Sequence, residues 1–263
     1  MKCRRTVMEK TIGSPEWFRE RAKDRLNIIH DRQTSQSREE FIKKYAPEKL
    51  AAMNGSELLD NVFGNGSTML YDLMDDKEKY INFGSAGAYK YNRIVYCDKD
   101  GIWKYRRGQK SRQVTKHEAA DKAEEIMYQL LLIMKNLYNV KKLDTLGDYL
   151  DLEKRISFAF FYKYNWALKY YQMFFPLWFP CMYSDSTLSR AVDILGLENH
   201  GTDKFANFAE MGLFVQRCGI GSVLMGTVYG QYWGWKETRS ACDAADQNWR
   251  DSRIPISSYL AKH

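Results

Sequence analysis

The clearest periodic pattern of hydrophobic positions follows residue 115, where apolar side chains recur at steps of three and four residues. Such positions share one face of an α-helix, because the helix turns once every 3.6 residues; they are Ala119, Ala123, Ile126, Leu130, Met134 and Leu137. The preceding Thr115-Lys116-His117-Glu118 has the form of a capping box, in which a hydroxyl and a carboxylate satisfy free backbone N–H groups. The sequence therefore predicts a long amphipathic helix from this point.

Shorter helices are predicted on both sides of the long one. In the first third of the chain, helices are predicted to begin at Ser14-Pro15, at Pro47 and after Gly55-Ser56. The residues Ser37-Arg38-Glu39-Glu40 have the form of a capping box, which predicts a short helix through Tyr45. In the second half, Ser184-Asp185 begins a helix that ends at Gly196, and two further segments cover 204–217 and 222–232. Most of the chain is thus expected to be helical.

A pattern typical of β-strands lies between residues 91 and 106. Residues 91–97 and 102–106 are rich in aromatic and β-branched side chains, and Asp98-Lys99-Asp100-Gly101 between them supplies a turn. We predict a β-hairpin here, following a flexible stretch at Gly84 and Gly87. Together with the helices, it predicts an α+β fold that is mostly helical, with a small antiparallel sheet near residues 78–107.

The segment from Phe158 to Tyr183 is unusually aromatic, because thirteen of its twenty-six residues are Phe, Tyr or Trp. Pro176 and Pro180 end the run, which predicts a helix of about 17 residues before them. Rings around most of its circumference favour a core helix. The alternative is an aromatic cage for a flipped base, which requires some rings to be exposed in a pocket.

Chain length and segment order predict two domains. A chain of 263 residues can form one large domain or two of ordinary size, and a linker or short helix near 140–150 is a natural boundary. We expect residues 1–142 to hold the short helices, the basic hairpin and the long amphipathic helix. Residues 143–263 would then form an aromatic-rich helical domain.

Overall composition is that of a soluble globular protein, with 44% hydrophobic and 28% charged residues. The five cysteines are an odd number without a CxxC pair, which favours free thiols in a reducing compartment. The basic N-terminus lacks the apolar run of a signal peptide, and no stretch of about eighteen apolar residues predicts a membrane span. The expected location is cytoplasmic.

Positive charge is concentrated on the predicted hairpin. Residues 90–112 contain eight Lys or Arg and two Asp, a local net charge of +6, whereas the whole chain carries +7. Cations can bind phosphates and interleaved rings can stack on bases. The candidate phosphate contacts are Lys90, Arg93, Lys104, Arg106, Arg107, Lys110 and Arg112, and the candidate stacking residues are Tyr91, Trp103 and Tyr105. The alternative is a hairpin with one packed face and one face solvated by cations.

Catalytic motifs are missing from the sequence. None of the four histidines has the spacing of a zinc site, and no GxSxG nucleophile elbow occurs. Gly196 and Gly201 have the spacing of a phosphate-binding loop, but Thr202-Asp203 stands where the loop needs Lys-Ser/Thr. We therefore expect a non-catalytic protein without cofactor or metal. A site assembled from distant residues, for instance around His200, is the alternative.

The order of several short motifs resembles the N-terminal region of McrB-like AAA+ restriction proteins. The matching motifs are Phe83-Gly-Ser-Ala-Gly-Ala-Tyr-Lys-Tyr91, Asp100-Gly-Ile-Trp103, Glu118-Ala-Ala-Asp-Lys-Ala-Glu-Glu-Ile126, Lys169-Tyr-Tyr-Gln-Met-Phe-Phe-Pro176 with Phe179, Ser184-Asp185 with Leu188, and Ile194-Leu195-Gly196. They extend over roughly residues 55 to 235 of this chain. In this family the region recognises the target, an AAA+ motor follows it, and a partner nuclease cuts the DNA.

The resemblance implies DNA recognition, including recognition of modified bases, in a prokaryotic defence system. It also implies an AAA+ motor and a nuclease subunit as partners. The chain departs from the family because it contains no Walker A, Walker B or arginine-finger segment, so the motor activity does not carry over. The alternative function is a protein–protein interaction module that docks on such a motor or nuclease, for which an exposed apolar patch around Trp233 and Trp235 would be the sign.

Overall fold

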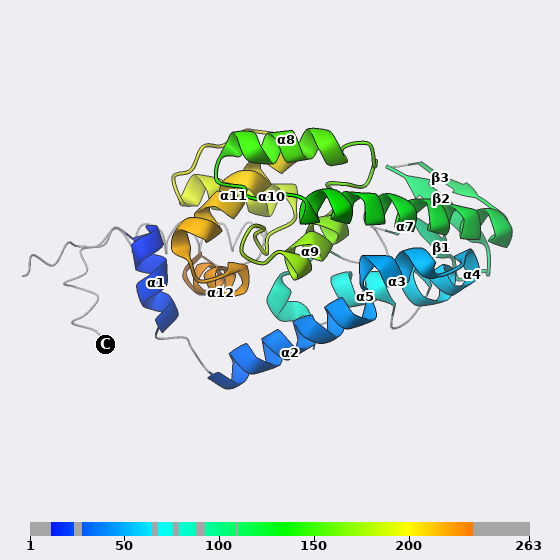
Figure 1. Ribbon diagram of the computed structural model, residues 1–263, viewed down its shortest axis with the longest axis horizontal. Helices are drawn as coiled ribbons and strands as arrows, with labels where there is room; N and C mark the ends of the chain where they lie inside the picture. The colour runs from blue at the N-terminus through cyan, green and yellow to red at the C-terminus, as the bar shows by residue number, and fades with distance from the viewer. Residues whose placement is uncertain are drawn as a thin grey trace, which may run out of the picture.

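The computed structural model describes residues 12–23, 28–64, 68–75, 79–87, 93–108 and 110–233. The described chain is mostly helical with one small antiparallel sheet, which confirms the predicted α+β class. Figure 1 shows the sheet at one end of the molecule, beside the long helix α7, and helices α1 and α12 at the other end.

Helices make up the first part of the chain: α1 (Pro15–Lys23), α2 (Ile28–Lys44), α3 (Pro47–Ala52), α4 (Gly55–Leu58), the π-helical turn η1 (Leu59–Phe63), α5 (Met69–Met74) and the 3₁₀ turn η2 (Ile81–Phe83). Most of them are short, as predicted, but α2 has 17 residues. The predicted capping box at Ser37 is wrong, because residues 37–40 lie inside α2. There the Arg38 Nε donates a hydrogen bond to the Met173 carbonyl oxygen at 2.7 Å, and Phe41 is fully buried. These contacts favour a continuous helix.

Helices also make up the chain after the sheet: α7 (Lys116–Tyr138), α8 (Leu146–Ile156), α9 (Asn165–Phe174), α10 (Asp185–Ile194), α11 (Lys204–Cys218) and α12 (Ser222–Trp233). The capping box of α7 forms as predicted: the Glu118 N–H donates to Thr115 Oγ1, and the Thr115 N–H donates to the Glu118 carboxylate. The six predicted core positions of α7 are all buried.

Replacing Thr115 with alanine is expected to lower the free energy of unfolding by about 1 kcal/mol, because one capping acceptor at the start of α7 is lost. Thr115 is exposed, so packing changes little. The loss is measured by urea denaturation, with Thr115→Ser as the control that keeps the hydroxyl. Equal losses in the two variants would contradict the capping role.

The sheet has three strands in the order β1 (Val95–Cys97), β2 (Trp103–Arg107) and β3 (Lys110–Gln113), all antiparallel. The predicted turn forms: Gly101 has φ +79°, and the Asp98 carboxylate accepts the N–H groups of Asp100 and Ile102 at 3.0 Å. Residues 91 and 92 of the predicted first strand lie outside the described residues. Strand β3 extends the predicted hairpin by a third strand.

The aromatic segment contains a shorter helix than predicted. Residues 157–164 form turns with i to i−3 hydrogen bonds, such as that from the Tyr164 N–H to the Phe161 carbonyl, and only residues 165–174 form α9. The interpretation of this helix as a core helix agrees with its burial, since Trp166, Tyr170 and Tyr171 are fully buried. The ring of Trp166 stacks on Phe161 with centroids 5.2 Å apart.

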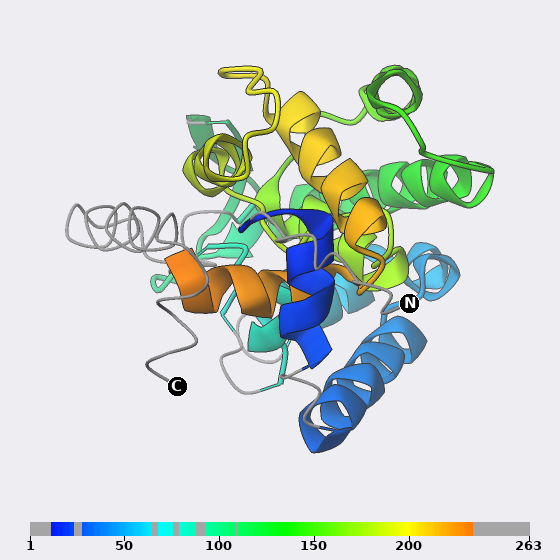
Figure 2. The ribbon, with the colours of Figure 1, turned by 90° about the vertical axis from the view of Figure 1, so that its left-hand side faces the viewer.

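One cluster of buried side chains extends across the predicted boundary at residues 142/143. Helix α1 packs on α11 and α12, and α2 and α5 pack on α9. Figure 2 shows α1 crossing in front of α12. The rings of Trp17 and Phe18 in α1 lie 5.6 and 5.9 Å from that of Trp233 in α12. The two predicted segments therefore share their core within the described residues.

Among the described helices, none alone combines the length and the hydropathy needed to cross a bilayer. Helices α11 and α12 reach that hydropathy only as a pair, and the chain bends by 100° between them.

Candidate nucleic-acid interface

The two faces of the sheet have different surroundings. Val95, Trp103 and Tyr105 lie on the face that packs against α7, since side chains alternate along each strand and paired residues share a face. Val95 is fully buried, and Trp103 and Tyr105 are half-buried against the core. The structure thus places two of the three predicted stacking residues on the inner face. The third, Tyr91, lies outside the described residues.

Three predicted phosphate contacts gather around Tyr96 on the outer face. The guanidinium groups of Arg93 and Arg106 lie 4.2 and 5.6 Å from the Tyr96 ring centroid. Lys104 Nζ lies 2.7 Å from an Asp98 carboxylate oxygen. This hydrogen bond raises the pKa of Lys104 and lowers that of Asp98. Lys104 is therefore charged, but a neighbouring acid balances its charge.

The predicted cations Arg107 and Lys110 lie opposite each other where β2 turns into β3, and both are exposed. The Arg107 guanidinium lies 5.1 Å from the centroid of the Phe160 ring. The N–H of Gly108, in the same turn, donates to the Tyr164 hydroxyl at 3.3 Å. Among the described residues, no carboxylate forms an ion pair with Arg107 or Lys110, which leaves both charges available to a ligand.

Two predicted cations remain. Arg112 lies 3.9 Å from the Glu118 carboxylate of α7 and 5.9 Å from the Tyr105 ring, so an acid partly balances it. Lys90 lies outside the described residues. The predicted cations that the structure describes thus fall into three groups. Arg93, Lys104 and Arg106 lie around Tyr96, and Asp98 balances the charge of Lys104. Arg112 lies over α7, and Arg107 and Lys110 form a pair at the β2–β3 turn without a described acidic partner.

At the β2–β3 turn, the basic hairpin contacts the aromatic segment that begins at Phe158. Phe160 and Tyr164 are half-buried, and their rings meet edge to face with centroids 5.9 Å apart. They supply partly exposed rings beside Arg107, which lies opposite Lys110 in the strand pair. We call these four side chains the turn site. Sequence reasoning did not pair the two rings with the hairpin, although their aromatic segment stood out by composition.

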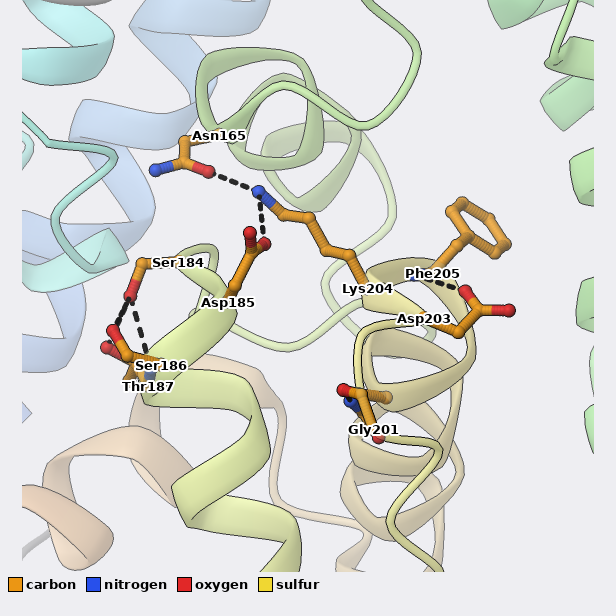
Figure 3. A network of polar contacts seen from close by, with 10 residues as sticks. Asn165, Ser184, Asp185, Ser186, Thr187, Gly201, Asp203, Lys204 and Phe205 are labelled. Atoms are coloured by element: carbon orange, nitrogen blue, oxygen red, sulfur yellow. Dashed lines mark hydrogen bonds and ion pairs between the residues drawn. The ribbon is translucent and has the colours of Figure 1, made fainter.

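A second polar network surrounds Lys204, where three helices begin (Figure 3). Its ammonium group donates to the side-chain oxygen of Asn165, the first residue of α9, and lies 3.2 Å from the carboxylate of Asp185, the first residue of α10. Burial lowers the pKa of Lys204, and Asp185 opposes this shift. The Asp203 carboxylate caps α11 by accepting the N–H groups of Phe205 and Ala206 at 3.1 Å. Each of these contacts anchors a helix start.

Within the part of the chain that the structure describes, Glu198, His200 and Glu210 form a group with the composition of a metal site; their ligand atoms all lie within 4.8 Å of one another. His200 Nε2 lies 3.4 Å from Glu210 Oε1, and the His200 N–H donates to Asn207. His200 and Glu210 are half-buried and Glu198 is exposed. The contacts with Glu210 and Asn207 are enough to explain the position of His200 without a metal.

One of the two tryptophans expected in the apolar patch of a docking module, Trp233, lies within the described residues, and its side chain is buried. Trp233 is buried against Trp17, Phe18 and Tyr229, and Trp235 lies outside the described residues. The large apolar side chains that are exposed are scattered over other elements: Tyr128, Tyr138, Phe158 and Leu177.

No protein-family model, curated protein or solved structure matches the chain. The resemblance to the McrB-like N-terminal region therefore stays a prediction.

Proposed function

We propose that the protein binds nucleic acid at the turn site, without catalysing a reaction on its own. The observation that carries this proposal is the pairing of two exposed, unbalanced cations, Arg107 and Lys110, with the half-buried rings of Phe160 and Tyr164. Nucleic-acid backbones attract cations, and base faces stack on aromatic rings. The turn site offers both kinds of contact, because the cations flank the β2–β3 turn and the rings of residues 160 and 164 lie against it.

The remaining predicted cations support the proposal less directly. Arg93, Lys104 and Arg106 add positive charge on the outer face of the sheet. This charge attracts a polyanion over a distance, even where the side chains do not contact it. Because Asp98 balances Lys104, we assign direct phosphate contacts to the turn site first. Trp103 and Tyr105 contribute to binding by holding the sheet on α7.

The resemblance to McrB-like proteins narrows the polyanion to DNA, with base modifications as one determinant of recognition. Under this proposal the chain is a recognition module of a cytoplasmic restriction system, and its partners are an AAA+ motor and a nuclease. Docking on such a partner without binding DNA is the alternative function.

The double variant Arg107→Gln, Lys110→Gln is expected to weaken DNA binding and to reduce its salt dependence. Each phosphate contact adds about 0.9 to the slope of log K against log salt for duplex DNA and about 0.7 for single strands. The slope should therefore become shallower by about 1.8 for a duplex or about 1.4 for a single strand. Fluorescence anisotropy with a labelled oligonucleotide, titrated at several salt concentrations, measures both quantities.

The matched control is Lys154→Gln, Arg155→Gln, which removes two adjacent exposed cations from α8. It lowers the net charge by the same amount but should leave the slope nearly unchanged. If both double variants change the slope equally, the protein binds DNA through its overall charge and the turn site is wrong. If the wild type binds neither single strands nor duplexes, methylated or unmethylated, the nucleic-acid function itself is wrong.

A further inference from the structure

A cavity of about 610 Å³ lies between α1, α2 and the start of α12, far from the sheet. Figure 2 shows these three helices on the side of the molecule that faces the viewer. The volume falls within the range of about 300–1,000 Å³ that is usual for small-molecule sites. The nucleic-acid proposal does not involve this part of the fold.

Most of the described cavity wall is apolar, and the charged side chains among its described residues are all positive. The apolar side chains come from α1, η2, the loop after α9 and the start of α12: Ala22, Phe83, Pro176, Leu177, Ile220, Val223 and Leu224. Among the described residues, the charged side chains that line the cavity are Arg19, Lys23 and Arg38, and no described Asp or Glu does so. A wall of this kind complements a ligand that is apolar over most of its surface and negatively charged at one end.

Arg38 is the cation best placed to bind such a charge. It is half-buried, and its Nε donates to the Met173 carbonyl at 2.7 Å, which fixes the guanidinium group at the wall. Among the described residues it forms no ion pair. Burial lowers the pKa of Arg38, and the neighbouring Glu39 opposes this shift. A half-buried guanidinium that forms no ion pair with a described residue gains from an anion that accepts its remaining N–H groups.

The two other cations of the wall, Arg19 and Lys23, lie on α1, and each already contacts a carboxylate of the same helix. Arg19 donates to the Arg217 carbonyl at 2.7 Å and pairs with Glu16. Lys23 lies 3.3 Å from Glu20 and is exposed. Both add positive potential at the cavity mouth, but each already has an acidic neighbour.

The start of α12 completes the wall. Gly219 and Gly221, with φ of +65° and +75°, turn the chain from α11 into α12 beside the cavity. Ser222 is fixed there, because its N–H donates to the Pro176 carbonyl at 3.1 Å and its hydroxyl accepts from Gln172 at 2.7 Å. The positive end of the α12 dipole adds to the field of Arg38.

We propose that this cavity binds a small amphipathic anion, a molecule with an apolar body and one carboxylate or phosphate group. The acidic group contacts Arg38 near the start of α12. The body lies on the apolar wall formed by Phe83, Ile220 and Val223.

Isothermal titration calorimetry on the full chain tests the proposal with decanoate, decyl phosphate and the neutral analogue decanol. The wild type should bind at least one of the two anions about tenfold more tightly than decanol, since a charge-assisted hydrogen bond to Arg38 forms only with the anion. The variant Arg38→Gln should lose that tenfold preference and keep its affinity for decanol. Val223→Trp, which fills the cavity, should abolish binding of all three molecules.

The matched control, Arg155→Gln, removes an exposed arginine from α8 and should bind as the wild type does. If Arg38→Gln does not fold, as judged by thermal melting, Lys23→Gln takes its place and should weaken anion binding severalfold. Three results would overturn the proposal: no anion binding below a Kd of about 1 mM, equal affinity for anion and alcohol, or unchanged anion affinity in the cation variant used.

Discussion

Replacing Gly84 with alanine is expected to lower the free energy of unfolding by at least about 3 kcal/mol. Gly84 has φ +80°, and a Cβ atom there would lie 2.1 Å from the Cys181 carbonyl oxygen and 3.1 Å from the Tyr183 ring. The chain cannot move away easily, because the buried Lys169 donates to the Gly84 carbonyl at 2.7 Å and the Tyr183 hydroxyl donates to Phe83. Urea denaturation followed by circular dichroism measures the loss.

Gly101→Ala is the matched control for this clash. Gly101 has nearly the same φ, +79°, but a Cβ atom there meets nothing within 4 Å. The control variant should lose only about 1 kcal/mol, from backbone strain alone. If both variants lose the same amount, the close approach of Gly84 to Cys181 does not limit stability and the packing described for this corner is wrong.

Replacing Trp166 with alanine is expected to cost about 4 kcal/mol, because it empties a large space in the core. Trp166 is fully buried and stacks on Phe161. Its Nε1 has no hydrogen-bond partner among the described residues, so the loss reflects packing alone. Trp166→Phe should accordingly cost clearly less than Trp166→Ala in the same denaturation assay.

Phe158→Ala supplies the comparison within the same aromatic segment. Phe158 is 50% exposed, so its removal should change the free energy of unfolding by less than about 1 kcal/mol. The pair of variants distinguishes rings that stabilise the core from rings that face solvent. Similar losses at the two positions would contradict the burial of α9.

Helix starts with strong local signals could be predicted from the sequence. Thr115 and Ser184 cap α7 and α10 as expected, and Gly196 follows the end of α10 with φ +65°. The box at Ser37 failed because its residue types also fit a helix interior, and a distant contact, from Arg38 to Met173, favours the continuous helix. A capping motif alone does not reveal whether the preceding residues are helical.

The turns of the aromatic segment and the third strand are two further features that could not be predicted from the sequence. The predicted aromatic helix begins at Phe158, yet residues 158–164 form turns in which Phe161 stacks on Trp166. Strand β3, Lys110–Gln113, has no aromatic or β-branched residue, and pairing with β2 rather than its own composition holds it. Local composition does not encode such partners.

The candidate site was predicted in part. The cations of the hairpin stood out by charge, and Arg107 and Lys110 are exposed as nucleic-acid binding requires. Sequence could not foresee that Asp98 balances Lys104, or that Phe160 and Tyr164 from a segment about fifty residues away complete the turn site. The cavity lined by Arg38 was also missed, because its walls come from five separate parts of the chain.

The packing of α1 against α12 affects how the protein is made in the cell. Trp17 and Phe18 are synthesised early but pack against Phe214 and Trp233, which are synthesised about two hundred residues later. During translation these early rings have no native partners until α11 and α12 leave the ribosome. The nascent chain therefore exposes apolar surface throughout that time, and chaperones that bind such surface should associate with it until α12 emerges.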